Sequence, residues 1–238
     1  MSGLPQQPSI FGGETHRLSA LTDGVFSIVM TLMVFNISLP KDRPSGYLTM
    51  ALLGLWASFL AYGISFGLVG IYWSAHLSMF RFIQRTSHEL VWLNIVFLAF
   101  VALVPFSTTL LAAHHSEPVA LIVYGGNLIL IGLSLLPLWW HAMVGGRLVQ
   151  RDLPDAVVRY GRSRILVGII GYGLATVLAL CSTEMSFVLF ALVPLMYIVP
   201  PVQRAWLRFY GLASTPGAPE SPRDSGGDSS SSSPKIPE

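Results

Sequence analysis

Six long apolar stretches constrain the fold of this chain more than any other feature. They cover residues 18–39, 47–73, 90–113, 118–144, 165–182 and 185–202. An α-helix needs roughly 20 mostly apolar residues to cross the hydrocarbon core of a bilayer. Only 11% of the residues are charged, against about 25% in a soluble domain. The sequence therefore predicts an all-α membrane protein with six transmembrane helices, of which the last two are short.

The cationic residues predict how these helices are oriented. With six spans, one side of the membrane holds only Lys41 and Arg43. The other side holds Arg17, Arg81, Arg85, Arg147, Arg151, Arg159, Arg162, Arg164, Arg204, Arg208, Arg223 and Lys235. Short cytoplasmic loops carry the excess of Lys and Arg, so both termini are expected in the cytoplasm of a multi-pass protein of the cell membrane. Arginines of residues 145–164 suit anionic lipid headgroups as well, although orientation alone explains them more simply.

The chain divides into a transmembrane domain, residues 1–210, and a tail, residues 211–238. From Ser214 onward the tail holds Pro, Gly, Ser and charged residues without an apolar run, a composition typical of disorder. Cys181 is the single cysteine, which excludes an internal disulfide. The histidines lack metal-ligand spacing and no serine lies in a GxSxG setting. The sequence predicts no enzyme active site, no metal or cofactor site and no nucleic-acid partner.

Small residues and prolines inside the stretches predict how the helices pack. Gly63 with Gly67, and Gly168 with Gly171, are spaced to let helix backbones approach closely. Three prolines are expected to kink the helices that contain them; these are Pro105, Pro137 and Pro194.

An acidic residue lies inside the first apolar stretch, "LTDGVFSIVMTLMVFNISLP". A carboxylate within a span is costly and usually faces protein or water. Arg17 precedes Asp23 by six residues, about 240° around a helix, so the two do not pair on one face. Trp73, His76 and Asn94 are expected at a similar depth. The group is either a gating or folding latch near the cytoplasmic mouth or a static polar network that fixes packing.

A stripe of four residues runs along the first stretch beyond Asp23. Gly24, Ile28, Thr31 and Phe35 recur at helical spacing and share one face. From periodicity alone, a packing surface is the simpler interpretation. If symmetric copies of this helix met on an axis, the stripe would instead form rings. Apolar rings constrict and dewet a pore, and a threonine ring offers oxygens to a cation.

Three segments resemble the transmembrane protein 175 family of potassium channels. They are "RLSALTDGVFSIVMTLMVFNISLP", "YWSAHLSMFRFI" and "LVWLNIVFLAFVALVPFSTTL", all within residues 17–110. The resemblance implies a six-span subunit of a homotetramer whose first helix lines a central pore for potassium and other monovalent cations. It implies that Ile28 forms the hydrophobic constriction, Thr31 faces the pore and Phe35 is a further apolar pore position. It also implies a polar cluster that supports the pore helix, made of Arg17, Thr22, Asp23, Trp73 and His76.

The chain departs from the family pattern at three places. Leu21 replaces an aromatic residue, Asn36 replaces an acidic one, and Phe35 is bulkier than the usual Leu or Met. These changes are expected to weaken an extracellular negative vestibule and to narrow the pore. No TVGYG segment is present, so the predicted selectivity for K⁺ is modest.

Two alternatives to a passive channel remain open at this point. One is a proton-coupled secondary transporter that uses Asp23 and His76 as a relay. The other is a non-conducting helical scaffold in the membrane, in which the stripe of the first helix only packs.

Overall fold

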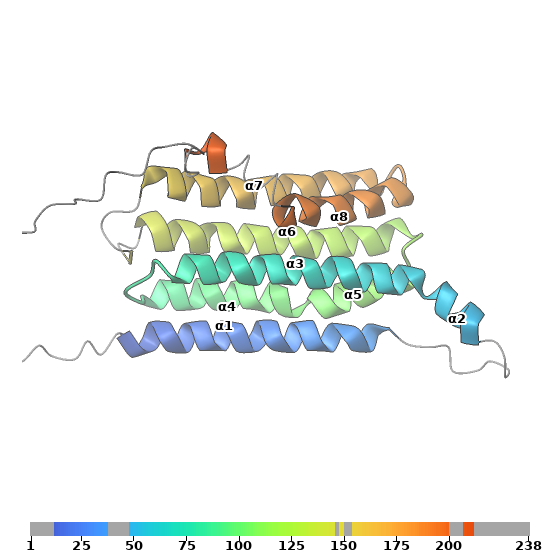
Figure 1. Ribbon diagram of the computed structural model, residues 1–238, viewed down its shortest axis with the longest axis horizontal. Coiled ribbons are helices and arrows are strands. Elements are labelled where there is room, and N and C mark those ends of the chain that lie inside the picture. Colours follow the sequence, from blue (N-terminus) through green and yellow to red (C-terminus); the bar gives the residue numbers. More distant parts are fainter. Residues whose placement is uncertain (1–11, 38–47, 146–147, 150–153, 200–206, 212–238) are drawn as a thin grey trace, which may run out of the picture.

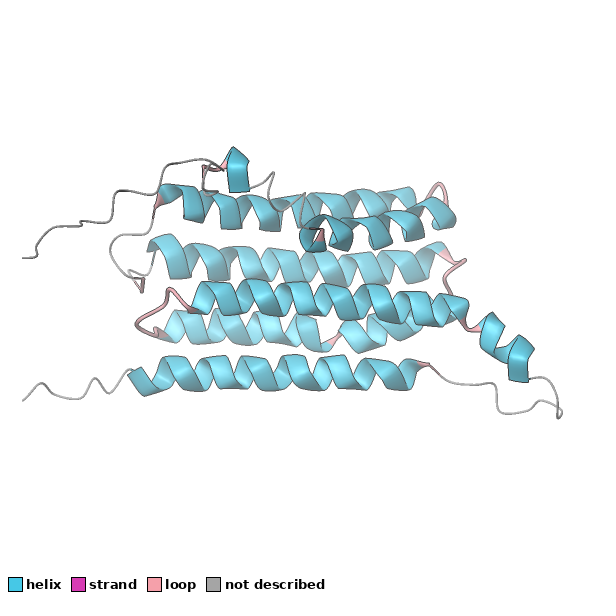
Figure 2. Cartoon of the chain, viewed as in Figure 1, coloured by secondary structure: helices cyan, strands magenta, loops and turns pink. Residues whose placement is uncertain are grey.

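The computed structural model describes residues 12–37, 48–145, 148–149, 154–199 and 207–211, and these form a bundle of helices (Figures 1 and 2). Among these residues the regular structure is helical, apart from an isolated bridge between Ile83 and Val149. The predicted tail beyond Gly211 lies outside the described residues, as do Lys41, Arg43, Arg147, Arg151 and Arg204. The helices are α1 (Gly12–Leu32, continued by the 3₁₀ turn Met33–Asn36), α2 (Leu48–Gly54), α3 (Trp56–Phe80), α4 (His88–Ala102), α5 (Val104–Ala113), α6 (Pro118–Trp140, continued by the π-helical turn His141–Gly145), α7 (Asp155–Leu178) and α8 (Thr183–Ile198).

The predicted all-α membrane architecture is confirmed, but the number of spans is established only in part. Five described segments are long and apolar enough to cross a membrane, namely Thr15–Phe35, Trp56–Phe80, His88–Ala113, Pro118–Gly145 and Asp155–Leu178. The sixth, α8, has 16 residues, or about 24 Å, which is shorter than a hydrocarbon core of about 30 Å. The sixth span therefore stays a prediction.

Two predicted boundaries were wrong. The stretch 47–73 is divided into α2 and α3 at Leu55, whose backbone leaves the helical region (φ −83°, ψ 4°), and α3 continues to Phe80. In this polar end, Trp73 and His76 form hydrogen bonds to α1 and α4, and the helix continues past them. The fifth predicted stretch corresponds to α7, which begins at Asp155 rather than at residue 165. Its arginines have long apolar stems and good helix propensity, so apolarity alone placed the start too late.

The third span is interrupted at Leu103, between α4 and α5. Pro105 follows this break at the start of α5, where a missing backbone N–H leaves no helical carbonyl unsatisfied. From Pro105 the sequence predicted a kink in this span. Pro137 and Pro194 instead lie inside continuous helices, and a π-helical turn begins four residues after Pro137.

The bundle is built around α6, which contacts α4, α5, α7 and α8. Helix α1 lies at one edge, against α3, α4 and α5, whereas α7 lies at the opposite edge (Figure 1). The beginnings of α1, α4 and α7 and the ends of α3 and α6 share one end of the bundle. Arg17, Arg81 and Arg159 belong to helix termini at this end. The described cations therefore gather where the sequence predicted one side to be cationic.

Candidate ion pathway

The predicted stripe lies on the exposed face of α1. Ile28 is 58% exposed and Phe35 is 74% exposed, and Gly24 and Thr31 are exposed as well. The opposite face is packed inside the bundle, through Leu18, Thr22, Phe26, Val29 and Met33. Thr31 follows Thr22 by nine residues, about two and a half helical turns, so these two side chains point in opposite directions. The fold therefore gives α1 one face that packs in the bundle and another that is exposed among the described residues.

The hydroxyl groups on the exposed face of α1 donate to their own helix. Thr31 Oγ1 donates to the carbonyl oxygens of Ser27 at 3.0 Å and of Ile28 at 2.9 Å. Ser27 Oγ donates to the carbonyl oxygen of Asp23 at 2.7 Å. Because a hydroxyl has one proton and two lone pairs, this bonding leaves the oxygen lone pairs able to accept a cation. Ser27, which lies one residue before Ile28, is a further exposed hydroxyl of α1 that the sequence pattern did not single out.

Asp23 is bound by the indole of Trp73. Trp73 Nε1 on α3 donates to Asp23 Oδ1 at 2.8 Å, and both side chains are only partly covered. This charge-assisted bond ties α1 to α3 at the flank of the exposed face. The sequence had placed Trp73 at the right depth to meet Asp23.

A second polar group is fully buried and links three helices. His76 Nε2 on α3 lies 2.8 Å from Asn94 Oδ1 on α4, and Asn94 Nδ2 donates to Thr22 Oγ1 on α1 at 3.0 Å. Thr22 in turn donates to the carbonyl oxygen of Leu18 at 3.0 Å. Since the amide oxygen of Asn94 can only accept, the proton of this bond belongs to His76 Nε2.

The ring of His76 is held by aromatic neighbours. It stacks on Phe80 with centroids 4.1 Å apart and lies nearly parallel to Phe97 at 5.8 Å. The polar network is thus enclosed in an apolar shell, which strengthens its hydrogen bonds. His76 and Asp23 share no hydrogen bond within the subunit, and each has a different partner.

The structure does not bring Arg17 into this cluster. Arg17 is exposed in the first part of α1, and it precedes Ile28 by eleven residues, about three turns. Helical phase therefore puts Arg17 on the same face as Ile28, at the end of α1 where the cations gather. Of the predicted supporting residues, Thr22, Asp23, Trp73, His76 and Asn94 meet their partners within one subunit.

Another buried polar group joins α3, α5 and α6, and sequence analysis missed it. Ser65 Oγ lies 2.9 Å from the Tyr124 hydroxyl and accepts from Thr108 Oγ1 at 2.8 Å. Asn127 Nδ2 donates to Ser107 Oγ at 3.1 Å. The sequence signal for this group is the pair of adjacent hydroxyl residues after Pro105, Ser107 and Thr108. Their partners could not be predicted, because they depend on how α5 faces α3 and α6. Within the described part of the chain, no group of three His, Cys, Asp or Glu side chains could hold a metal ion.

Comparison with known proteins assigns the chain to a family. Residues 17–105 match the family model described as "Endosomal/lysosomal potassium channel TMEM175". A protein of Streptomyces collinus named as a potassium channel is 35% identical over 188 residues, which cover 77% of this chain and 91% of that protein. The chain belongs to the TMEM175 family. A protein of Chamaesiphon minutus, also named as a potassium channel, is 34% identical over 185 residues, which cover 74% of this chain and 91% of that protein.

A solved TMEM175 structure has the same fold. It is described as a crystal structure of a lysosomal potassium-selective channel TMEM175 homolog from Chamaesiphon minutus. The TM-score is 0.69 at 29% sequence identity, over 79% of this chain and 97% of that one. The TMEM175 family consists of ion channels rather than enzymes.

Proposed function

We propose that this protein is a passive, potassium-permeable cation channel, assembled as a homotetramer around a central pore lined by four copies of α1. Membership of the TMEM175 family supports potassium permeation, because two relatives that cover most of this chain are named potassium channels. The observation that carries the pore assignment is the stripe of α1, whose side chains are largely exposed among the described residues. Four such stripes facing one axis give a ring at each of Ile28, Thr31 and Phe35.

The stripe suits a cation that loses part of its hydration. A ring of Ile28 side chains offers no hydrogen bonds, so an ion must shed water there, and apolar constrictions of this kind also gate by dewetting. K⁺ is larger than Na⁺ and holds its water less tightly, which favours K⁺ without a filter of carbonyl groups. Thr31 lies about one turn away, and its outward lone pairs stabilise the partly dehydrated ion.

The two polar contacts of α1 set the position of the pore helix. The Trp73–Asp23 bond attaches α1 to α3, and the His76–Asn94–Thr22 chain attaches it to α3 and α4. Both lie toward the end of α1 where the cations gather, which we assign to the cytoplasmic side of the cell membrane. Arg17 lies on the pore-facing side of α1 at this end. Its positive charge reduces the net negative charge at the cytoplasmic mouth of the pore.

Potassium flux from liposomes tests the constriction. Ile28→Asn places an amide at the ring, removes the dry barrier and is expected to raise K⁺ flux about tenfold while lowering K⁺ over Na⁺ preference. Ile170→Asn on α7 is the matched control, because Ile170 is 60% exposed and lies at the opposite edge of the bundle. Flux is followed with a K⁺-sensitive dye at equal protein content.

The same assay separates the alternatives. A proton-coupled transporter gives flux that saturates with substrate, follows an imposed pH gradient and is abolished by Asp23→Asn. A scaffold gives no flux above that of protein-free vesicles. Equal effects of Ile28→Asn and Ile170→Asn contradict a pore at Ile28.

A further inference from the structure

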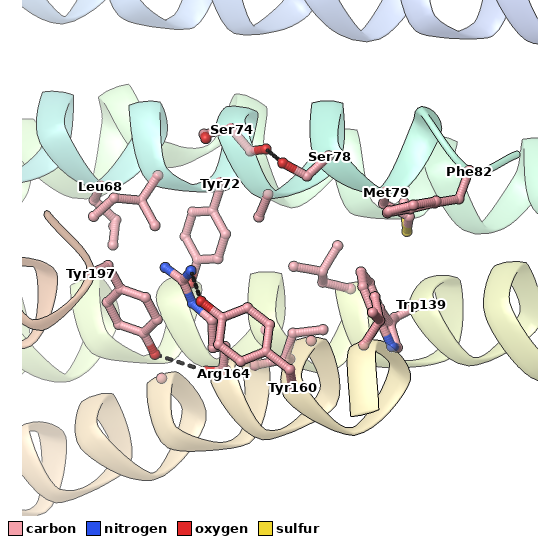
Figure 3. A pocket seen from close by; sticks show the side chains of 18 of the residues that line it. Leu68, Tyr72, Ser74, Ser78, Met79, Phe82, Trp139, Tyr160, Arg164 and Tyr197 are labelled. Carbon is pink, nitrogen blue, oxygen red and sulfur yellow. Dashed lines mark hydrogen bonds between the residues drawn. The ribbon is translucent and has the colours of Figure 1, made fainter. Parts of the chain in front are cut away.

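A cavity of about 330 Å³ lies between α3, α6 and α7, closed at one side by Tyr197 of α8 (Figure 3). Its volume is within the range of roughly 300–1,000 Å³ that is usual for ligand pockets. Its wall is mostly apolar and includes Leu68, Met79, Leu135 and Ile165. Ser74, Ala75 and Ser78 of α3 also line it, and all three are at least partly exposed. The cavity therefore opens sideways, at membrane depth, toward the surroundings of the bundle.

The one charged side chain among the described lining residues is Arg164. Figure 3 shows its guanidinium between the rings of Tyr160 and Tyr197, whose centroids are 5.5 and 4.9 Å from the guanidinium carbon. Arg164 Nη1 donates to the Tyr160 hydroxyl at 2.9 Å. In the described part of the chain Arg164 forms no ion pair, so its charge has aromatic faces and one hydroxyl as partners but no anion.

This uncompensated charge is unusual because Arg164 lies within the span Asp155–Leu178. A charged group away from water is costly unless it is paired, and an ionisable residue inside a span commonly marks a functional site. The guanidinium has five N–H donors, of which one has an acceptor in the described structure. Four remain for a ligand that offers oxygens.

Two further donors of the same wall lack partners. The indole N–H of Trp139 and the hydroxyl of Tyr172 are buried without a hydrogen bond to the described residues. No Asp or Glu occurs among the described lining residues. Arg164 and Trp139 can only donate, and the hydroxyl groups of the wall can donate as well. The cavity therefore matches a ligand that is anionic at one end and apolar elsewhere.

The depth of Arg164 identifies the source of such a ligand. Arg164 follows Asp155 by nine residues, about 13 to 14 Å of helix. Its guanidinium lies between the rings of Tyr160 and Tyr197 and faces the cavity, which opens toward the surroundings of the bundle. Basic pockets between transmembrane helices are known binding sites for anionic lipid headgroups.

We propose that this cavity binds an anionic phospholipid of the surrounding bilayer. The phosphate lies against the guanidinium of Arg164, and one acyl chain enters along the apolar wall between α3 and α7. Because α7 and α1 lie at opposite edges of the bundle (Figure 1), the site is separate from the proposed ion pathway. The lipid supplies a counter-charge that the described lining residues lack, and it fills the space between α3 and α7.

Lipid retention tests this proposal without measuring conduction. Protein reconstituted in vesicles of phosphatidylcholine with phosphatidylglycerol is extracted in mild detergent, and the phospholipid bound per subunit is measured by mass spectrometry. The wild-type protein is expected to retain phosphatidylglycerol over phosphatidylcholine. Arg164→Gln is expected to reduce this retention about tenfold, because it removes a charge-assisted phosphate contact.

Arg162→Gln is the matched control, since Arg162 is exposed and lies two residues earlier on the same helix; it is expected to keep the lipid. Ala75→Trp fills the mouth with Arg164 intact and is expected to lose the lipid. If Arg164→Gln fails to elute like the wild-type protein, Ala75→Trp decides the question. Equal retention of the two phospholipids, equal loss in Arg162→Gln, or displacement by inorganic phosphate overturns a specific lipid site.

Discussion

Asn94 shows how a single side chain can hold three membrane helices in register. Its amide accepts from His76 on α3 and donates to Thr22 on α1, while its own backbone belongs to α4. It is fully buried, as is Thr22, and His76 is 3% exposed. None of these polar groups has water as an alternative partner, so losing the central amide leaves the other two unsatisfied.

Replacing Asn94 by Leu is expected to destabilise the bundle. The substitution keeps the size of the side chain but removes two interhelical hydrogen bonds, each contributing about 0.6 to 2 kcal/mol in a membrane protein. We expect the free energy of unfolding to fall by about 1 to 3 kcal/mol, measured by detergent denaturation.

Asn127 provides the comparison for Asn94. It is also buried, but its amide makes one hydrogen bond, to Ser107, and its Oδ1 has no partner among the described residues. Asn127→Leu should therefore cost less than Asn94→Leu, or even stabilise the protein. A larger loss at Asn127 would show that the network of Asn94 does not hold α1.

At the residue scale, the sequence predicted which polar side chains lie at one level of the bundle better than how these side chains pair. Composition and depth placed Asp23, Trp73, His76 and Asn94 at one level of the bundle. Which of them touch depends on how α3 and α4 are rotated about their own axes, and the apolar pattern of nearly uniformly hydrophobic helices does not define that rotation. Arg17 was predicted to join this cluster but does not. Its position could have been found from the sequence, because helical phase alone puts it on the face of Ile28.

Glycine contacts determine how closely the helices of the second half approach one another. A Cβ atom added at Gly125 of α6 would meet Thr176 of α7 and would lie 2.8 Å from Phe190 of α8. At Gly132 it would lie 2.6 Å from Ile169, and at Gly161 it would meet Trp139. Small residues let backbones approach in a membrane, where packing rather than the hydrophobic effect drives helix association.

The adjacent pair Gly125 and Gly126 gives a direct test of this packing. Gly125→Ala is expected to destabilise the bundle by about 1 to 3 kcal/mol through overpacking against α7 and α8. An added Cβ at Gly126 meets nothing within 4 Å, so Gly126→Ala should be neutral or stabilise the helix by up to about 1 kcal/mol. Detergent denaturation of both variants is the measurement, and equal costs would refute the close approach at Gly125.

At the scale of elements, the sequence predicted the helices well and their mutual approach only in part. Gly168 and Gly171 do lie close to α8, since added Cβ atoms would be 3.1 Å from the Tyr197 hydroxyl and 3.0 Å from Val193. Gly63 has nothing within 4 Å, and Gly67 is 3.9 Å from Ile198, so this pair does not bring helices together within the subunit. The sequence could not distinguish the glycine pair of α7 from that of α3, because residue spacing does not tell which face of a helix is covered by another helix.

For the molecule as a whole, the decisive property is that α1 has two different faces. The buried face, with Phe26 and Met33, fixes α1 to the bundle, while Ile28, Thr31 and Phe35 are exposed at its edge in the described part of the chain. Neither face carries more than scattered polar groups, so hydropathy alone could not distinguish a lipid-facing stripe from a pore-lining one. A lipid-facing stripe and a pore-lining stripe differ in whether water reaches them.

Thiol chemistry detects that water. In a Cys181→Ser background, which removes the exposed native cysteine, Thr31→Cys should react with a charged methanethiosulfonate reagent added in water, because only a hydrated thiol ionises to the reactive thiolate. Each modified subunit then places a bulky charge in the pore, so K⁺ flux should fall several-fold and recover after reduction with dithiothreitol. Leu174→Cys on α7 is the control, since Leu174 is 61% exposed at the far edge from α1 and should stay unreactive in lipid. If the Thr31→Cys variant proves as inert as the Leu174→Cys variant while the wild-type channel conducts, then α1 faces the bilayer and the pore lies elsewhere.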